Sequence, residues 1–370
     1  MRLRRMAQLV GVLTLLSVAA TTQGQCLSGA DVAICPAADV MYINRNDTLT
    51  ALSLSRGAVE WHIALPKSDS DFDGPVATAD TVAVWAGFPA TRVDGFDAAT
   101  GKHLWTVETS TDDMTALGHY VFVNDAEHWE ALTALDGRTG KRVWHHSGTR
   151  FSPNGRVRFY ASDGRTLLTN FFAIDAQSGL ILARWPRRRE VSAGVLGDKF
   201  AVIGISWAAD EPTKIAAYSL SGYETLWVKD DPRKREIRGL AADGNRVFAA
   251  LYPDASFLEP GEVGLDLLDA ASGKTIWSKT IKSDSTLYSA IGLTQGVAVF
   301  VTGDSAMSSS VEGFDAATGQ SKWRVHVDEK LVGSVLCAGA NCYIEAISSP
   351  GHVLGVNVQT GAQSWFRIPN

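Results

Sequence analysis

The sequence is poor in several features that define common classes of protein. Its apolar run at residues 9–20 is too short to cross a bilayer, which takes about 20 residues as a helix. No segment has the period of a long amphipathic helix. Acidic residues outnumber basic ones, 40 to 34, which argues against a nucleic-acid partner. No Cys-x-x-Cys and no histidine pair at the spacing of a zinc site occurs, so a membrane-spanning, helical, nucleic-acid-binding or zinc-dependent protein is not expected.

Residues 1–25 have the layout of a secretory signal peptide. Three arginines precede the apolar run at residues 9–20, and small and polar residues follow it. A lipoprotein signal has small residues directly before the modified cysteine, whereas Gln25 precedes Cys26. We therefore expect that the signal peptide is cleaved and that the protein is exported, periplasmic or secreted, without a lipid anchor.

The four cysteines lie near the two ends of the chain, and an even number in an exported protein indicates disulfides. Three pairings are possible. Cys337 and Cys342 flank a tight turn, which leaves Cys26 for Cys35, so we predict Cys26–Cys35 and Cys337–Cys342. The other pairings would link the first part of the chain to the last.

The stretch at residues 93–105 returns in variant form along the chain. An apolar strand ends at Phe96, Asp97 opens a turn, Gly101 closes it, and a second strand leads to Trp105. Asp accepts backbone N–H groups at the start of a type I turn and Gly supplies a positive φ, so the stretch predicts a β-hairpin. The corresponding tryptophans are Trp61, Trp105, Trp144, Trp185, Trp227, Trp277, Trp323 and Trp365.

Eight repeats of roughly 43 residues account for residues 26–370 as one domain. Two further strand-like runs precede each hairpin, for example at residues 237–241 and 246–250. Four antiparallel strands in each of eight repeats predict an all-β fold, an eight-bladed β-propeller, which we expect to be a monomeric ring.

Two repeats are irregular. In the fourth, Gly179 stands six residues before Trp185 instead of four, so that Ala183 takes the usual tryptophan place. In the fifth, Tyr223 stands where the turn glycine should be. We predict that these two turns differ in shape from the others.

The repeats resemble the PQQ-type propeller repeat, whose pattern Ala-x-Asp-x-x-Thr-Gly-x-x-x-Trp is present at residues 134–144. In that family the tryptophan packs between neighbouring blades. A large ring with one N–H donor suits such a gap. The resemblance therefore implies that the eight tryptophans are structural and have no role in chemistry.

Quinoprotein dehydrogenases of this family are longer, have two adjacent cysteines, and place calcium-binding carboxylates and a catalytic Asp around the axis. No adjacent cysteine pair occurs in this chain. The predicted innermost strands carry no carboxylate, and they lie at residues 75–78, 114–117, 191–196, 289–293 and 332–336. We therefore expect no catalytic residues, no PQQ and no calcium.

One stretch argues for a metal. Asp69, Asp71 and Asp73 match the opening of a calcium loop, and Asp80 falls at its twelfth position. A strand at residues 75–79 would carry Asp80 roughly 16 Å from Asp73, so the full loop cannot close. A partial site and a solvated acidic loop remain the two interpretations.

The loops that leave the tryptophan strands carry charges of one sign on adjacent blades. The basic group consists of Arg187, Arg188, Arg189, Arg233, Lys234 and Arg235. Acidic loops follow the first, second and seventh tryptophans. One interpretation is a docking face that steers a protein partner, and the other is a set of solvated loops.

A short exported eight-bladed chain of this kind resembles the propeller subunit of the outer-membrane β-barrel assembly machinery. The resemblance implies a non-enzymatic scaffold with protein partners in the cell envelope. Two alternatives stay open: a propeller that binds a quinone or another small ligand, as an enzyme or a sensor, and a secreted module that recognises a polymer or a peptide.

Overall fold

The structure is a computed structural model of the whole chain. It describes residues 26–28, 32–45, 47–65, 72–86, 90–111, 113–125, 131–148, 157–162, 164–185, 190–197, 199–206, 213–233, 235–252, 261–283, 290–303, 308–346 and 352–367. The expected signal peptide, residues 1–25, lies outside this part.

The first four sheets follow one another in chain order. Blade 1 contains β1 (Leu27–Ser28), β2 (Val32–Cys35), the 3-10 turn η1 (Pro36–Ala38), β3 (Val40–Arg45), β4 (Thr48–Ser53) and β5 (Val59–Ala64). Blade 2 contains β6 (Phe72–Ala77), β7 (Thr81–Ala86), β8 (Ala90–Asp97) and β9 (His103–Thr111). Blade 3 contains β10 (Met114–Leu117), β11 (Tyr120–Asn124), β12 (Leu132–Asp136) and β13 (Arg142–His146). Blade 4 contains β14 (Phe159–Ser162), β15 (Thr166–Thr169), β16 (Phe172–Asp175) and β17 (Ile181–Arg184).

The other four sheets complete the ring. Blade 5 contains β18 (Glu190–Leu196), β19 (Phe200–Ser206), β20 (Thr213–Ser219) and β21 (Thr225–Asp231). Blade 6 contains β22 (Glu236–Asp243), β23 (Arg246–Tyr252), β24 (Gly261–Asp269) and β25 (Thr275–Ser283). Blade 7 contains β26 (Ile291–Thr294), β27 (Val297–Gly303), β28 (Ser309–Asp315) and β29 (Ser321–Val327). Blade 8 contains β30 (Leu331–Ala338), β31 (Asn341–Ala346), β32 (His352–Asn357) and β33 (Gln363–Arg367).

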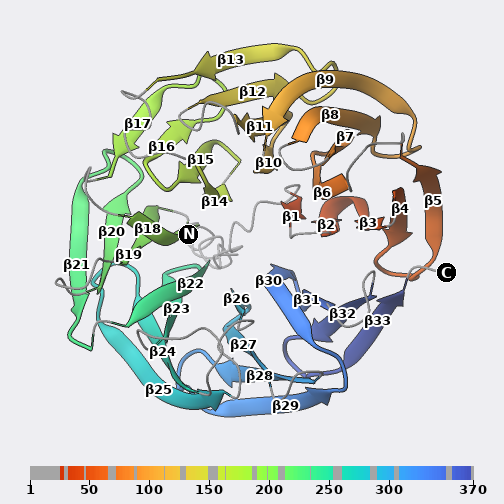
Figure 1. Cartoon of the computed structure of the whole chain (residues 1–370). Helices are drawn as coiled ribbons and strands as arrows, with labels where there is room; N and C mark the ends of the chain where they lie inside the picture. Colours follow the sequence, from red (N-terminus) through yellow and green to blue (C-terminus); the bar gives the residue numbers. More distant parts are fainter. Residues whose placement is uncertain are drawn as a thin grey trace, which may run out of the picture.

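The prediction of an all-β, eight-bladed propeller is confirmed. The sheets surround a central axis, and within each blade the antiparallel strands run in chain order from the axis to the rim (Figure 1). Blades 1 and 8 are each built from one segment of chain, so no described strand of one completes the other. Among the described residues, these two blades meet through an apolar layer and share no sheet.

The middle strands of each blade bury both faces, because alternate side chains point to opposite neighbours. In β27, Val299 packs toward blade 8 with Ile344, whereas Phe300 packs toward blade 6 with Leu265. The outermost strands instead alternate between exposed and half-buried residues, as in β29. The hydrophobic core is therefore a series of layers between blades.

The repeated turn has the chemistry that its sequence predicts. In blade 2, Asp97 Oδ1 accepts the backbone N–H of Thr100 at 2.9 Å and its hydroxyl at 2.7 Å. Gly101 has φ of 70° and donates its N–H to the carbonyl of Asp97 at 2.8 Å. A Cβ on Gly101 would lie 2.8 Å from the ring of Trp61 in blade 1, so glycine serves both the turn and the junction between blades.

The two irregular turns keep the common shape, so the prediction that they differ is wrong. Gly179 in blade 4 has φ of 72°, and Tyr223 in blade 5 has φ of 57°. Each donates its N–H at 2.8 Å to the residue that opens the turn, Asp175 or Ser219. Tyr223 adopts the left-handed conformation because this closing hydrogen bond holds it there, at a cost of about 1–2 kcal/mol.

Six of the repeat tryptophans join their blade to the next, because the indole N–H donates to a carbonyl in the next blade's turn. The pairs are Trp61 with Ala98 (3.1 Å), Trp105 with Gly137 (2.6 Å), Trp144 with Ala176 (2.9 Å), Trp227 with Ala270 (2.7 Å), Trp277 with Ala316 (3.1 Å) and Trp323 with Val358 (2.7 Å).

Trp185 and Trp365 depart from this pattern. Ala183 pairs with Ala173 at the usual tryptophan place, so Trp185 lies past the end of β17 and donates to the carbonyl of Thr169 in its own blade. Its ring still contacts blade 5, with its centre 4.9 Å from that of Tyr218. The tryptophan side chain thus reaches the next blade there without the hydrogen bond.

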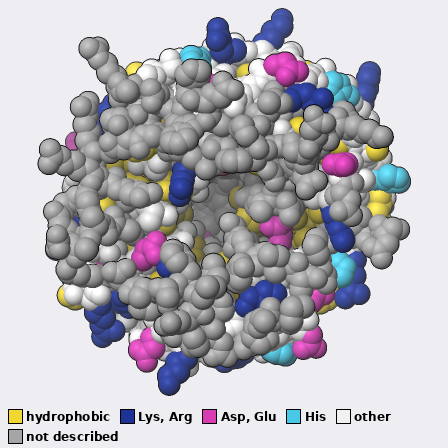
Figure 2. Space-filling view, in the orientation of Figure 1, with side chains coloured by type: hydrophobic (Ala, Val, Ile, Leu, Met, Phe, Trp, Pro, Cys, Tyr) yellow, Lys and Arg dark blue, Asp and Glu magenta, His cyan; other side chains and the backbone are white. Residues whose placement is uncertain are grey.

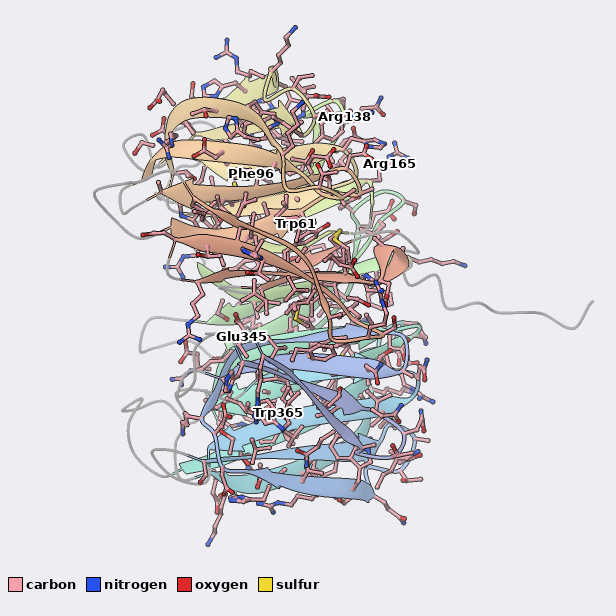
Figure 3. The ribbon with its side chains drawn as sticks, turned by 90° about the vertical axis from the view of Figure 1, so that its right-hand side faces the viewer. Trp61, Phe96, Arg138, Arg165, Glu345 and Trp365 are labelled. Atoms are coloured by element: carbon pink, nitrogen blue, oxygen red, sulfur yellow. A yellow bond between two sulfur atoms is a disulfide. The ribbon has the colours of Figure 1, made fainter. Side chains whose placement is uncertain are left out.

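Trp365 faces the opposite way. In seven blades the pairing of the third and fourth strands contains a bulge, whereas β32 and β33 pair without one. Relative to the partner strand, Trp365 therefore lies one residue away from the place that the repeat spacing gives it. A one-residue shift turns a strand side chain to the other face. Trp365, which is labelled in Figure 3, therefore packs in the layer between blades 7 and 8. Phe366 packs in the layer that faces blade 1. Sequence spacing alone places Trp365 wrongly between blades 8 and 1.

The structure has the two predicted disulfides, Cys26–Cys35 and Cys337–Cys342. Each lies within one blade at the axial end of its sheet, the first beside β1 and β2 and the second between β30 and β31 (Figure 3). These are the two blades that meet where the ring closes. Their junction is an apolar layer that includes Ile34 and Tyr343.

Two carboxylates of the repeated turns have pKa values that the fold lowers. A hydrogen bond from Ser272 lowers the pKa of Asp269, and one from Thr318 lowers that of Asp315. A carboxylate whose pKa is depressed by folding stabilises the protein above its unfolded pKa of about 3.9, and this contribution is lost as the pH falls through the folded value.

We therefore expect the melting temperature to fall between about pH 5 and pH 3, and less steeply in the double variant Asp269→Asn/Asp315→Asn. Asn357 already makes the same contacts in blade 8 without titrating, so asparagine fits the turn. Calorimetry across this pH range measures the slope. Equal slopes in wild type and variant would show that these turns do not control acid stability.

Candidate functional site

The connection between blades 5 and 6 holds the described part of the basic group in the predicted docking face. Arg233 and Arg235 lie between β21, the outermost strand of blade 5, and β22, the innermost strand of blade 6. Four of the six basic candidates lie outside the described residues, and they are Arg187, Arg188, Arg189 and Lys234. On the face seen in Figure 2, described side chains of both charges are interspersed around the rim.

Arg235 is not an exposed steering charge. Its Nε donates to Oδ2 of Asp231 at 3.1 Å, and its Nη2 donates to Oδ1 at 3.1 Å. Its backbone N–H also donates to Oδ2, at 2.8 Å. The side chains of Arg235 and Asp231 are only 15% and 9% exposed, whereas Arg233 is exposed. Arg235 therefore fixes the connection between the blades instead of pointing into solvent.

The ion pair keeps Asp231 charged despite its burial. Burial alone would raise the pKa of Asp231, but the hydrogen bonds and the positive charge of Arg235 outweigh it, so the pKa lies below its usual value. A bidentate arginine–carboxylate pair is among the strongest side-chain interactions. Asp231 is not among the candidates predicted from the sequence, although it stands only four residues before Arg235.

The guanidinium of Arg235 lies against blade 6. A Cβ added to Gly264 of β24 would be 1.8 Å from Nη1 of Arg235, so only glycine leaves this space. Nε, Nη2 and the backbone N–H are all taken by Asp231. Nη1 makes no hydrogen bond to any residue that the structure describes.

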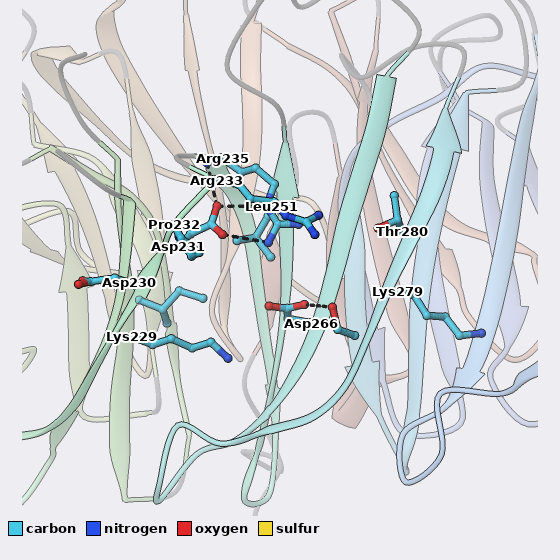
Figure 4. A pocket seen from close by; sticks show the side chains of 12 residues that line it. Lys229, Asp230, Asp231, Pro232, Arg233, Arg235, Leu251, Asp266, Lys279 and Thr280 are labelled. Carbon is cyan, nitrogen blue, oxygen red and sulfur yellow. Dashed lines mark hydrogen bonds and ion pairs between the residues drawn. The ribbon is translucent and has the colours of Figure 1, made fainter. Parts of the chain in front are cut away.

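A pocket of about 280 Å³ opens beside this pair, between β21 of blade 5 and β24 and β25 of blade 6 (Figure 4). Two apolar side chains, Ile215 and Leu251, contribute to its wall. Charged side chains of both signs line the rest, and they are Lys229, Asp230, Asp231, Arg233, Arg235, Asp266 and Lys279.

Most of these charges have partners. Asp231 binds Arg235, and Asp230 lies 3.7 Å from Lys214. Lys229 donates to the hydroxyl of Thr275. The ammonium of Lys279 lies over the ring of Phe314 in blade 7, 4.9 Å from its centre, and so does not point into the pocket. Asp266 makes no ion pair with a described residue, and its Oδ1 accepts the hydroxyl of Ser278 at 2.6 Å.

The candidate calcium ligands are not brought together by the described structure. Asp69 and Asp71 lie outside the described residues, and Asp73 lies in β6 opposite Trp85 instead of in a loop. Within the described ranges, no three His, Cys, Asp or Glu side chains are close enough to share a metal ion.

The inner strands do carry carboxylates, contrary to the sequence-based expectation, because they begin earlier than predicted. β22 starts at Glu236, whose Oε2 accepts from Nε of Arg238 at 2.8 Å. The guanidinium of Arg238 also lies 4.9 Å from the centre of the Tyr252 ring. Glu236 is therefore part of an ion pair near the axis.

Among the described segments, none forms a helix with the length and apolar character that crossing a membrane takes.

The family model for outer membrane protein assembly factor BamB matches residues 18–229 and 211–367. The outer membrane protein assembly factor BamB of Burkholderia pseudomallei is 27% identical over 289 residues, which cover 71% of this chain and 68% of that protein.

Solved structures share the fold. The crystal structure of BamB from Moraxella catarrhalis has a TM-score of 0.62 and 14% identity, and covers 90% of this chain and 92% of that one. The computationally designed Ika8 protein has a TM-score of 0.63 and 14% identity, with coverage of 94% and 98%. The dihydro-heme d1 dehydrogenase NirN has a TM-score of 0.60 and 13% identity, with coverage of 82% and 67%. The same propeller thus occurs in an assembly factor, a designed protein and a dehydrogenase, so the fold alone does not assign an activity.

Proposed function

Because this chain belongs to the family of outer membrane protein assembly factor BamB, we propose that it is an exported, non-enzymatic scaffold that takes part in outer-membrane protein assembly. The observation that carries this proposal is the extent of the match. The two matched segments, residues 18–229 and 211–367, together run through all eight blades. The ring as a whole, rather than one local site, is what the chain shares with the family.

Features of the described chain support an extracytoplasmic scaffold. All four cysteines are paired in disulfides, which suits an oxidising compartment. The repeat tryptophans and glycines are used to pack one blade on the next, which gives a rigid ring whose loops are available to partners. We propose protein partners in the cell envelope on this basis.

Deletion of the gene in its native host tests this function. We expect the folded fraction of outer-membrane β-barrel proteins to fall, and a plasmid copy of the wild-type gene to restore it. The measurement is the shift of heat-modifiable barrels on electrophoresis, with a periplasmic protein that is not a barrel as the control. Unchanged barrel folding in a verified deletion strain would contradict the proposal.

A further inference from the structure

The outer rim of blade 3 carries a group of cations that no other repeat has. Between the residue that opens the turn and the repeat tryptophan, blade 3 contains Arg138, Lys141 and Arg142, whereas each other repeat has at most one Lys or Arg there. All three residues are exposed. The turn itself does not require them, because the place of Arg138 is neutral in the seven other repeats.

These three charges are not neutralised by the residues that the structure describes. None of the three forms an ion pair with a described residue. Asp136 opens the same turn, but its Oδ1 accepts the N–H of Thr139 at 2.9 Å and the hydroxyl of Thr139 at 2.6 Å. Three cations against one carboxylate leave this turn positive, in a chain whose net charge is -6.

Two exposed apolar side chains accompany the cations. Val143, next to Arg142, is 45% exposed, and Leu104 of blade 2 is 38% exposed. Both stand one residue before the tryptophan of their repeat. The turn of blade 3 packs on the strand of Leu104, because a Cβ on Gly140 would lie 2.8 Å from the ring of Trp105. We define the rim patch as Leu104, Arg138, Lys141, Arg142 and Val143.

The rim patch lies on a projecting edge of the ring. Arg138 is labelled near the outer edge in Figure 3, and Lys and Arg side chains project from the rim in Figure 2 where β13 lies in Figure 1. Small molecules bind in concave sites that enclose them, whereas a projecting edge fits a broad surface. Lys and Arg side chains beside apolar ones are typical of protein surfaces that bind anionic membranes.

We propose that the rim patch binds the surface of an anionic phospholipid bilayer. Arg138, Lys141 and Arg142 contact the lipid phosphates, and the two apolar side chains enter the headgroup region. A cation near such a surface strengthens binding about fivefold, so the three together contribute roughly a hundredfold. This surface is separate from the proposed role in outer-membrane protein assembly and does not depend on it.

Flotation of the folded, disulfide-bonded protein with lipid vesicles tests the proposal. We expect the protein to float with vesicles of phosphatidylglycerol mixed with phosphatidylcholine, less so at high salt, and not with vesicles of phosphatidylcholine alone. Equal binding to both kinds of vesicle, or no binding to the anionic vesicles, would overturn the proposal. Binding to immobilised poly-L-glutamate without binding to anionic vesicles would assign the patch to an acidic protein segment and would overturn it as well.

Matched variants locate the binding surface. Lys141→Gln/Arg142→Gln removes two cations from the rim patch and should weaken binding to the anionic vesicles at least about tenfold. Lys274→Gln/Lys322→Gln removes the same charge from exposed places on blades 6 and 7, and should change binding less than about twofold because those charges lie beyond the screening length. Circular dichroism checks that both variants fold. Equal losses in the two double variants would show that net charge and not the rim patch controls binding, which would refute the site.

Discussion

Replacing Trp323 with alanine is expected to lower the free energy of unfolding by about 3–5 kcal/mol. The indole packs against Gly361 of blade 8, where a Cβ would lie 2.9 Å from the ring, and its N–H donates to the carbonyl of Val358 at 2.7 Å. Alanine leaves a cavity between blades 7 and 8 and a carbonyl without its donor. Urea unfolding followed by fluorescence and circular dichroism measures the difference.

The matched control is Trp365, which has the same place in the sequence repeat but no hydrogen-bond partner among the described residues. Trp323→Phe keeps most of the ring and removes the donor, which should cost about 1–3 kcal/mol. Trp365→Phe removes no described hydrogen bond and should cost clearly less. Equal losses in the two phenylalanine variants would contradict the role of the N–H between blades.

Reversing the charge of Arg235 is expected to destabilise the fold by about 3–5 kcal/mol, because it leaves Asp231 buried without its cation and adds a second carboxylate beside it. Connections between blades commonly bury little, but the side chains of Arg235 and Asp231 are only 15% and 9% exposed, so this connection is part of the packed fold.

Arg233→Glu is the control, since Arg233 is exposed in the same connection and should change stability little. Thermal unfolding of the two single variants gives the comparison. A folded Arg235→Glu protein with wild-type stability would show that the ion pair contributes nothing. Arg233 is then also the described residue at which steering of a partner is best tested, by association rates at two salt concentrations.

Several local features followed from the sequence because they depend on residues within one hairpin. Asp97 and Gly101 close the turn through hydrogen bonds between neighbours in the chain, and the same or similar residue types recur in most repeats. The pairing of Cys337 with Cys342 is local in the same sense, because the two residues lie opposite each other across a turn. The eightfold recurrence of such hairpins is what allowed the propeller to be predicted.

The candidate site was predicted only in part. Arg233 and Arg235 were visible as a basic cluster, but exposure of a charge cannot be read from composition. Asp266 could have been noticed by aligning it with Asp94, because Gly264 then falls at the place of Arg92. Only the tertiary structure shows that Gly264 allows the guanidinium of Arg235 to lie against β24.

By itself the sequence determined the turn, the hairpin and the number of blades, since each rests on short-range geometry repeated along the chain. The disulfides could be predicted for a related reason, because each joins cysteines that are close in the sequence. Tertiary structure decided which way Trp365 faces and which acid Arg235 binds. A single bulge changes the register by one residue and so reverses a side chain, and neither repeat spacing nor residue type reports it. The contact of Arg235 with Gly264 joins two blades, so it exists only after the ring has brought their surfaces together.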